Sequence, residues 1–96
     1  MEGLTITRHD AGGNGEYRAH VPGTEVIGRL TWYLEDGVKV ADHTLVPPEI
    51  GNRGVAAKLV EALIADAQRD GFKIRPDCSY VAVAFRRHPE WSSLQA

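Results

Sequence analysis

The N-terminal half of the chain alternates between apolar and polar residues, which is the pattern of half-buried β-strands. Four segments carry this alternation: residues 4–8, 17–21, 26–34 and 38–46. Turn sequences separate them at residues 12–15, at Pro22-Gly23 and at Asp36-Gly37. Proline followed by glycine favours a type II turn, and aspartate followed by glycine favours a two-residue hairpin turn of type I′. The pattern therefore predicts a four-stranded antiparallel meander.

The chain then changes to a helical period. Apolar residues recur at spacings of three and four between residues 54 and 70, and Gly71 is placed to end this helix in a left-handed conformation. A short strand is predicted at 72–76, parallel to the strand at 38–46 and joined to it by a right-handed crossover. The carboxyl ends of these two strands lie at one edge of the sheet, where ligands usually bind in open α/β sheets.

A second, shorter helix is predicted at residues 79–88, with Asp77 or Ser79 as its cap. In the tail that follows, we expect the apolar side chains of Trp91 and Leu94 to pack back against the core. The element order is then β-β-β-β-α-β-α. This is an α+β (or α/β) fold in which the meander is followed by a βαβ crossover and a short C-terminal helix.

Length and composition narrow the classes of function. The 96 residues form a single domain, and 43% hydrophobic with 25% charged residues is ordinary for a globular chain. A net charge of −2 argues against binding to double-stranded nucleic acid. A content of 7% aromatic residues argues against binding to single-stranded nucleic acid. The single cysteine excludes a disulfide within the chain, and one cysteine with scattered histidines makes no metal-ligand motif. No leader or membrane-spanning run is expected, so the predicted compartment is the cytoplasm.

The segment from Gly51 to Ala56 has the composition of a phosphate-binding loop. Two glycines and an asparagine stand where a strand exit meets a helix start, so successive backbone N–H groups can turn toward an anion. The helix N-terminus and Arg53 add positive charge. The same glycines would also suit a tight turn into a helix without any ligand.

This loop resembles the acyl-CoA pyrophosphate loop of the GNAT superfamily of N-acetyltransferases, and the chain resembles the short branch of that superfamily over residues 4–94. Gly54 and Ala56 match the last two fixed positions of the loop, whereas Gly51 stands where the family has a long Arg or Gln side chain, and Asn52 where it often has glycine. The other matching residues are Asp42, His43, Thr44, Val46, Pro47 and Pro48, then Pro76, Cys78, Ser79, Tyr80 and Val81, and finally His88, Pro89, Glu90 and Trp91.

The resemblance implies acetyl-CoA as co-substrate, with no metal. The diphosphate would lie on the loop and helix start, formed by Gly51, Asn52, Arg53, Gly54, Val55, Ala56 and Ala57. The pantetheine arm would enter a gap between residues 42–46 and 72–76, and a main-chain N–H of Leu45 or Val46 would polarise the thioester carbonyl.

Cys78 is the first candidate for chemistry at the acyl site. It stands just before a helix start, where the pKa of a thiol falls, although Asp77 beside it opposes this. It would take the acetyl group as a thioester, or only line the acyl site. A small buried apolar residue is the ordinary alternative for a lone cysteine.

His43 is the candidate general base, because an imidazole is suited to removing a proton from an amine near neutral pH. Strict alternation along the strand places Asp42 and Thr44 on the face opposite His43, so Asp42 is not expected to orient it. A structural histidine within the sheet is the alternative.

The leading hypothesis is an acetyl-CoA-dependent N-acetyltransferase that acts on an unidentified amine, as a monomer or weak homodimer and without membrane or nucleic-acid partners. The second is a CoA-binding module without efficient catalysis, because so short a chain leaves few residues for an acceptor pocket. A hydrolase using Cys78 and His43 is a third, and it lacks an evident residue to orient the histidine.

Overall fold

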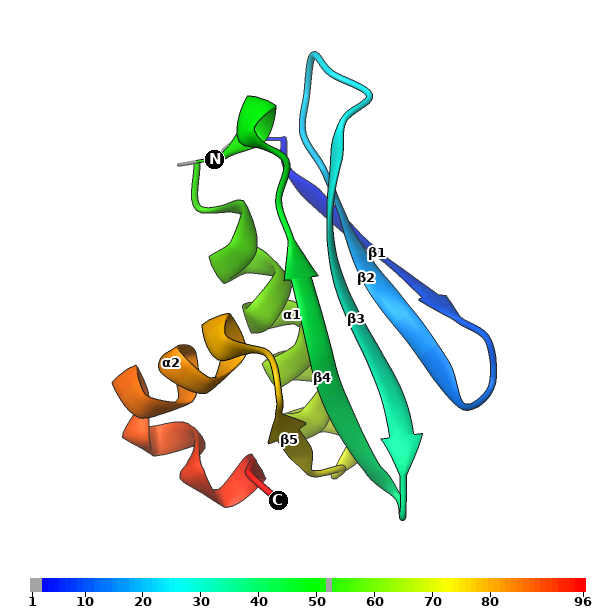
Figure 1. The fold of residues 1–96 in the computed structure, drawn as a ribbon, viewed down its shortest axis with the longest axis vertical. Coiled ribbons are helices and arrows are strands. Elements are labelled where there is room, and N and C mark those ends of the chain that lie inside the picture. Colours follow the sequence, from blue (N-terminus) through cyan, green and yellow to red (C-terminus); the bar gives the residue numbers. More distant parts are fainter. Residues whose placement is uncertain (1–2, 52) are drawn as a thin grey trace.

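The computed structural model describes residues 3–51 and 53–96, which form a five-stranded sheet with two α-helices (Figure 1). The elements in chain order are β1 (Thr5–Asp10), β2 (Asn14–His20), β3 (Ile27–Glu35), β4 (Val38–Leu45), the 3₁₀ helix η1 (Pro48–Ile50), α1 (Val55–Asp70), β5 (Ile74–Pro76), α2 (Ser79–Arg87) and the 3₁₀ helix η2 (Pro89–Leu94). The strands lie in chain order, the first four antiparallel and β5 parallel to β4. The predicted meander, crossover and short C-terminal helix are confirmed.

Residues with positive φ form two of the predicted chain reversals. Asp36 and Gly37 have φ of 53° and 79°, so both central residues of the β3–β4 turn are left-handed, as a type I′ turn requires. Gly71 follows α1 with φ of 81°, and its N–H donates to the carbonyl of Ala67. The sequence predicted both of these conformations.

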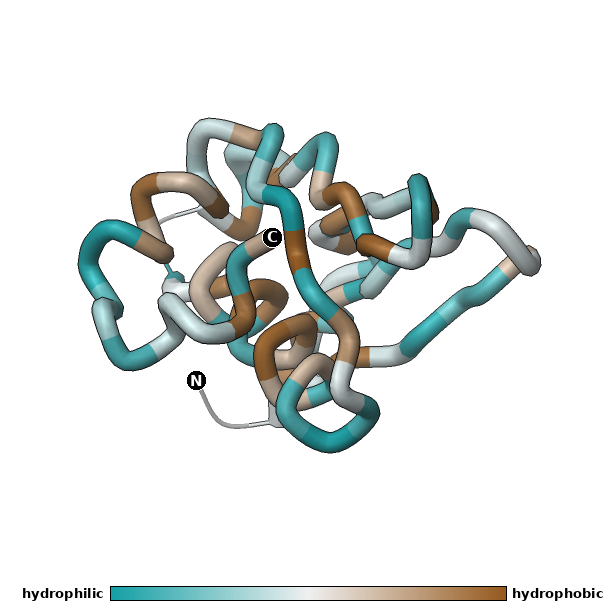
Figure 2. Tube along the Cα trace, turned by 90° about the horizontal axis from the view of Figure 1, so that it is seen from below, coloured by the Kyte–Doolittle hydropathy of each residue, from teal (hydrophilic) through white to brown (hydrophobic). Residues whose placement is uncertain are grey.

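Helix α1 packs against β2 and β3, and this contact makes the core. The side chains that meet there are almost fully buried: Tyr17, Leu30 and Trp32 from the sheet, and Val55, Leu59, Leu63 and Ala67 from the helix. Gly28 permits the close approach, since a Cβ at this position would lie 2.9 Å from Cγ1 of Val55. Figure 2 shows hydrophobic segments toward the centre of the molecule and hydrophilic ones in the outlying loops.

The two faces of the sheet therefore differ. The inner face packs against α1 and carries Tyr17, Leu30 and Trp32. The outer face carries the residues between them, such as Glu16 and Thr31, and no helix covers it in the described part of the chain (Figure 1). Any site on the outer face is thus open to solvent.

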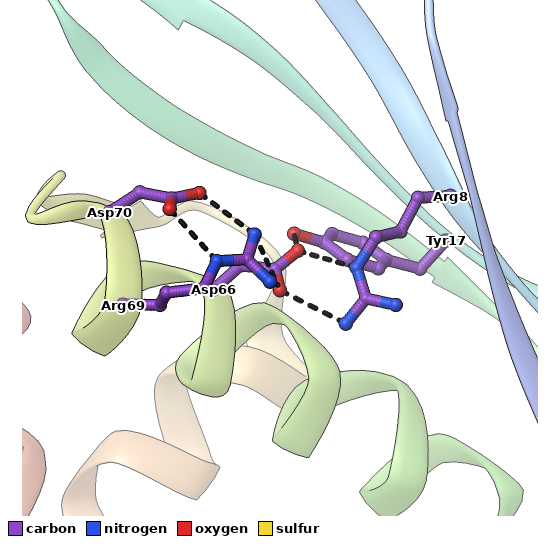
Figure 3. Close-up of polar contacts among 5 residues, drawn as sticks. All are labelled: Arg8, Tyr17, Asp66, Arg69 and Asp70. Carbon is purple, nitrogen blue, oxygen red and sulfur yellow. Dashed lines mark hydrogen bonds and ion pairs between the residues drawn. The ribbon is translucent and has the colours of Figure 1, made fainter.

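A buried carboxylate ties α1 to the first two strands (Figure 3). Asp66 is 4% exposed, and it accepts hydrogen bonds from Nε and Nη2 of Arg8 at 2.7 and 3.0 Å and from the hydroxyl of Tyr17 at 2.8 Å. Burial alone would raise the pKa of Asp66, but these donors outweigh it and hold the pKa below its usual value. Asp66 is therefore a charged, fully bonded member of the core.

Helix α2 begins differently from the prediction. Its N-cap residue is Cys78, and no side chain caps the helix, so the expectation of a cap by Asp77 or Ser79 was wrong. The tail forms η2, in which Trp91 contacts Phe85 edge to face with ring centroids 6.0 Å apart. Trp91 and Leu94 both pack against the core, as predicted.

Candidate functional site

Strands β4 and β5 stop pairing halfway along β4. Residues 39–41 pair with residues 74–76, and the backbone N–H groups of Asp77 and Cys78 then both donate to the carbonyl of Ala41, at 3.1 and 2.8 Å. Beyond this point β4 continues to Leu45, while the other chain turns into α2. The second half of β4 therefore faces the start of α2, and not residues 72–76 as expected, because those residues pair with or precede the first half of β4.

A β-bulge interrupts β4 at this same point. Thr31 of β3 lies opposite His43, but its neighbour Trp32 lies opposite Ala41, so Asp42 is an extra residue. In such a bulge two residues oppose one on the partner strand, and the alternation of faces is shifted beyond it. The expectation that Asp42 and His43 lie on opposite faces was wrong, since both oppose Thr31 on the outer face.

The hydroxyl of Thr31 donates a 2.7 Å hydrogen bond to Oδ1 of Asp42 across the outer face. His43, in register with the same threonine, is exposed. A shallow cleft of about 580 Å³ opens on this part of the sheet, and Asp10, Glu16 and Asp42 are among its lining residues. A solvent-accessible imidazole and several carboxylates thus share one region of the outer face.

Cys78 lies near the opposite, inner face of β4. Its Sγ is 3.3 Å from Oγ1 of Thr44, which belongs to the inner face because it pairs with Leu30. Burial would raise the pKa of the thiol, but the hydrogen bond that it makes with the Thr44 hydroxyl and the nearby backbone N–H groups of Val81, Tyr80 and Thr44 outweigh burial and lower the pKa below its ordinary value. The sequence analysis missed this role of Thr44, because it assumed unbroken alternation along β4.

The loop before α1 presents the start of a long helix without a side-chain cap. Gly54 is the N-cap with φ of 74°, and the first turn of the helix carries no acidic residue. Because the first helical bond runs from the N–H of Lys58 to the carbonyl of Gly54, the three preceding N–H groups lack helical partners. Gly51 has an extended φ of −68°, Arg53 is exposed, and Asn52 lies outside the described residues.

A cleft of about 360 Å³ lies between α1, α2 and η2. Its lining includes Ala57 from the first turn of α1, Tyr80 from the first turn of α2 and Trp91 from η2. The loop before α1 and Cys78 are each close in sequence to one of these lining residues, but neither lines the cleft. Leu45 and Val46, expected at the acyl site, follow Thr44 on β4 and at its exit.

Two observations bear on other classes of site. Within residues 3–51 and 53–96, no three histidine, cysteine, aspartate or glutamate side chains are grouped so that they could hold a metal ion. The helices described are also too short or too polar to cross a membrane.

Comparison with known protein families gives a match over most of the chain. The family model described as GCN5-related N-acetyl-transferase matches residues 16–94. No curated protein matches the chain. The matched range begins in β2 and includes β4, the loop before α1, Cys78 and η2, and therefore spans the whole candidate site.

Proposed function

Because the chain belongs to the GCN5-related N-acetyltransferase family, we propose that it transfers the acetyl group of acetyl-CoA to an amine. The observation that carries the proposal is the separation of β4 from β5 beside Cys78, together with the N-terminus of α1, which has no side-chain cap and follows β4 in the chain. Acetyl-CoA carries a thioester that would suit the first of these places and a diphosphate that would suit the second.

The diphosphate of CoA would bind at the start of α1. Its holders are the N–H groups of Val55, Ala56 and Ala57, together with the guanidinium of Arg53. The fit is supported by the uncapped helix end and by the left-handed Gly54, which turns the chain into the helix. Gly51 and Asn52, named from the sequence, complete the proposed loop.

Cys78 is proposed to act at the acetyl group. Its thiolate would attack the thioester carbonyl, so that a bond forms between Sγ and the acetyl carbon, the bond to the CoA sulfur breaks, and CoA leaves as its thiolate. The incoming amine would then attack the acetyl-cysteine and release the Cys78 sulfur. Support comes from the hydrogen-bond donors around Sγ, which favour the ionised form.

His43 is proposed as the base that accepts the proton of the amine, directly or through water. Its exposure on the outer face lets an amine approach from the side away from α1. The carboxylate of Asp42, which lies next to His43 on that face, favours an acceptor that carries positive charge, whereas Glu16 is already paired with Arg18 and Arg29. Leu45 and Val46 retain the proposed role of donating a backbone N–H to the carbonyl oxygen.

Calorimetry with CoA and acetyl-CoA tests the binding step. We expect saturable binding that Arg53→Ala weakens about three- to tenfold, because one cation near a diphosphate has gone. Arg86→Ala, which removes another exposed arginine outside the cleft lining, is the matched control and should bind like the wild type. Absence of binding at millimolar acetyl-CoA would overturn the proposal.

Mass spectrometry after incubation with acetyl-CoA tests the covalent step. We expect one added acetyl group on Cys78, lost when an acceptor amine is supplied and absent in Cys78→Ala. Transfer by Cys78→Ala at the wild-type rate would leave Cys78 as a lining residue only. Binding without transfer to any amine of a broad panel would assign the chain as a CoA-binding module.

A further inference from the structure

Cys78 is attached to β4 on both sides of the β-bulge. Its backbone N–H donates to the carbonyl of Ala41, the last residue before the bulge, at 2.8 Å. Its side chain lies 3.3 Å from the hydroxyl of Thr44, on the far side of the bulge. The irregular segment of β4 therefore fixes both the backbone and the sulfur of this residue.

The bulge decides which side chain reaches the sulfur. With unbroken alternation from Ala41, which is buried on the inner face, Thr44 would point to the outer face, away from Cys78. The extra residue, Asp42, shifts the alternation and brings Thr44 opposite Leu30 on the inner face.

The donors around Sγ come from two elements. The hydroxyl of Thr44 on β4 is hydrogen-bonded to Sγ, and the backbone N–H groups of Thr44 and of Tyr80 and Val81 in the first turn of α2 contribute to the lowered pKa of the thiol. While the sulfur is protonated, the thiol donates to the threonine oxygen. Once it is ionised, the hydroxyl can rotate and donate to the sulfur instead. The arrangement suits an anion at Sγ.

We propose that Thr44 is a positioning residue that directs the sulfur of Cys78 toward the gap beside β4 and stabilises it as a thiolate. The inference rests on the proposed function, in which this thiolate attacks the thioester. It assigns the activation of Cys78 to a threonine and to helix N–H groups, with no base in contact with the thiol.

The charged groups near Cys78 are few in the described part of the chain. Asp77 precedes it and is held by Nε of Arg75 at 3.1 Å, and Asp42 and His43 of β4 lie on the outer face. The largest causes of the shift in the pKa of Cys78 are burial and hydrogen bonds. A change at Thr44 can therefore be measured without a competing charge change.

The test is the rate of alkylation of the single thiol by iodoacetamide, measured from pH 5 to pH 10 with no CoA present. Thr44→Val keeps the shape of the side chain and removes the hydroxyl, and Thr44→Ser keeps the hydroxyl. We expect Thr44→Val to shift the midpoint of the pH profile upward by about one unit, so that alkylation at neutral pH slows about tenfold. Thr44→Ser should retain the wild-type profile.

Thr44→Ala guards against a packing effect of valine, because it removes the same hydroxyl without adding a methyl group at that place, and it should shift the profile in the same direction. An unshifted profile in Thr44→Val and Thr44→Ala, or an equal shift in Thr44→Ser, would overturn the proposal. Since the assay needs neither acetyl-CoA nor an acceptor, that result would leave the acetyltransferase proposal standing. If the thiol profiles are as expected but the protein does not bind acetyl-CoA, the acetyltransferase proposal is overturned and the assignment of Thr44 stands.

Discussion

The hydrogen bond between Tyr17 and Asp66 allows a quantitative test of what holds α1 on the sheet (Figure 3). Tyr17 is 2% exposed and its hydroxyl donates to a carboxylate that is 4% exposed, so both groups are withdrawn from water. Tyr17→Phe removes the hydroxyl and little else. The carboxylate keeps its two bonds from Arg8 and is not left unpaired.

The expected loss follows from these contacts. A hydrogen bond to a charged group contributes about 1.5–3 kcal/mol, so Tyr17→Phe should lower the free energy of unfolding by about 2 kcal/mol. Asp66→Asn should cost about 2–3 kcal/mol. Removal of one partner of a fully buried ion pair costs about 3–5 kcal/mol, but the side chain of Arg8 is 43% exposed and water can solvate it. A loss of 2 kcal/mol in a chain of this length lowers Tm by about 10 °C.

Urea unfolding at pH 7, followed by tryptophan fluorescence, measures these losses. Glu61→Gln is the matched control on the same helix, because Glu61 is exposed and its pair with Lys58 lies in solvent, so its midpoint should stay close to that of the wild type. The double variant of Tyr17 and Asp66 should lose less than the sum of the two single losses. Losses for Tyr17→Phe and Asp66→Asn no larger than for the control would refute the reasoning.

Two further predictions concern pH and the loop before α1. The folded pKa of Asp66 lies below its ordinary value of 3.8, so its contribution is present above that pH and is lost as the pH falls through the folded value. The difference in unfolding free energy between wild type and Asp66→Asn should therefore shrink from pH 5 to pH 2, and a constant difference would contradict this. Gly54→Ala should cost about 1–2 kcal/mol, since its φ of 74° is unfavourable for alanine and, among the described residues, no atom lies within 4 Å of a Cβ to offset the strain. Gly51→Ala, at an extended φ of −68°, should cost less in the same urea titration, and equal losses would argue against backbone strain at Gly54.

The fold was predictable because local signals agree with it. The turn at Asp36-Gly37 and the helix end at Gly71 each depend on a backbone conformation that their residue types favour, and the structure has both. The core contacts of α1 follow from its apolar stripe. The hydrogen bond between Tyr17 and Asp66 joins residues 49 positions apart, and a local sequence pattern does not predict such a distant partner.

The bulge in β4 was not predicted from the sequence. One extra residue leaves the apolar pattern of residues 38–46 readable as regular alternation, and Val40 and Ala41 are both fully buried although they are neighbours. Val40 pairs with Tyr33 and Arg75 on the outer face and is nevertheless fully buried. The assumption of regular alternation along β4 therefore led to two wrong expectations for the site: it turned Thr44 away from Cys78, and it placed Asp42 and His43 on opposite faces.

The corrected geometry also distinguishes the proposed reaction from hydrolysis by a cysteine–histidine pair. Such a hydrolase needs its base within hydrogen-bond reach of the thiol. Here the thiol is bonded to Thr44, which lies on the opposite face of β4 from His43. Under the proposed function the two groups therefore act at different steps: Thr44 and the helix N–H groups prepare the thiolate for the thioester, and the imidazole takes up, through water, the proton that the amine loses when it attacks the acetyl-cysteine.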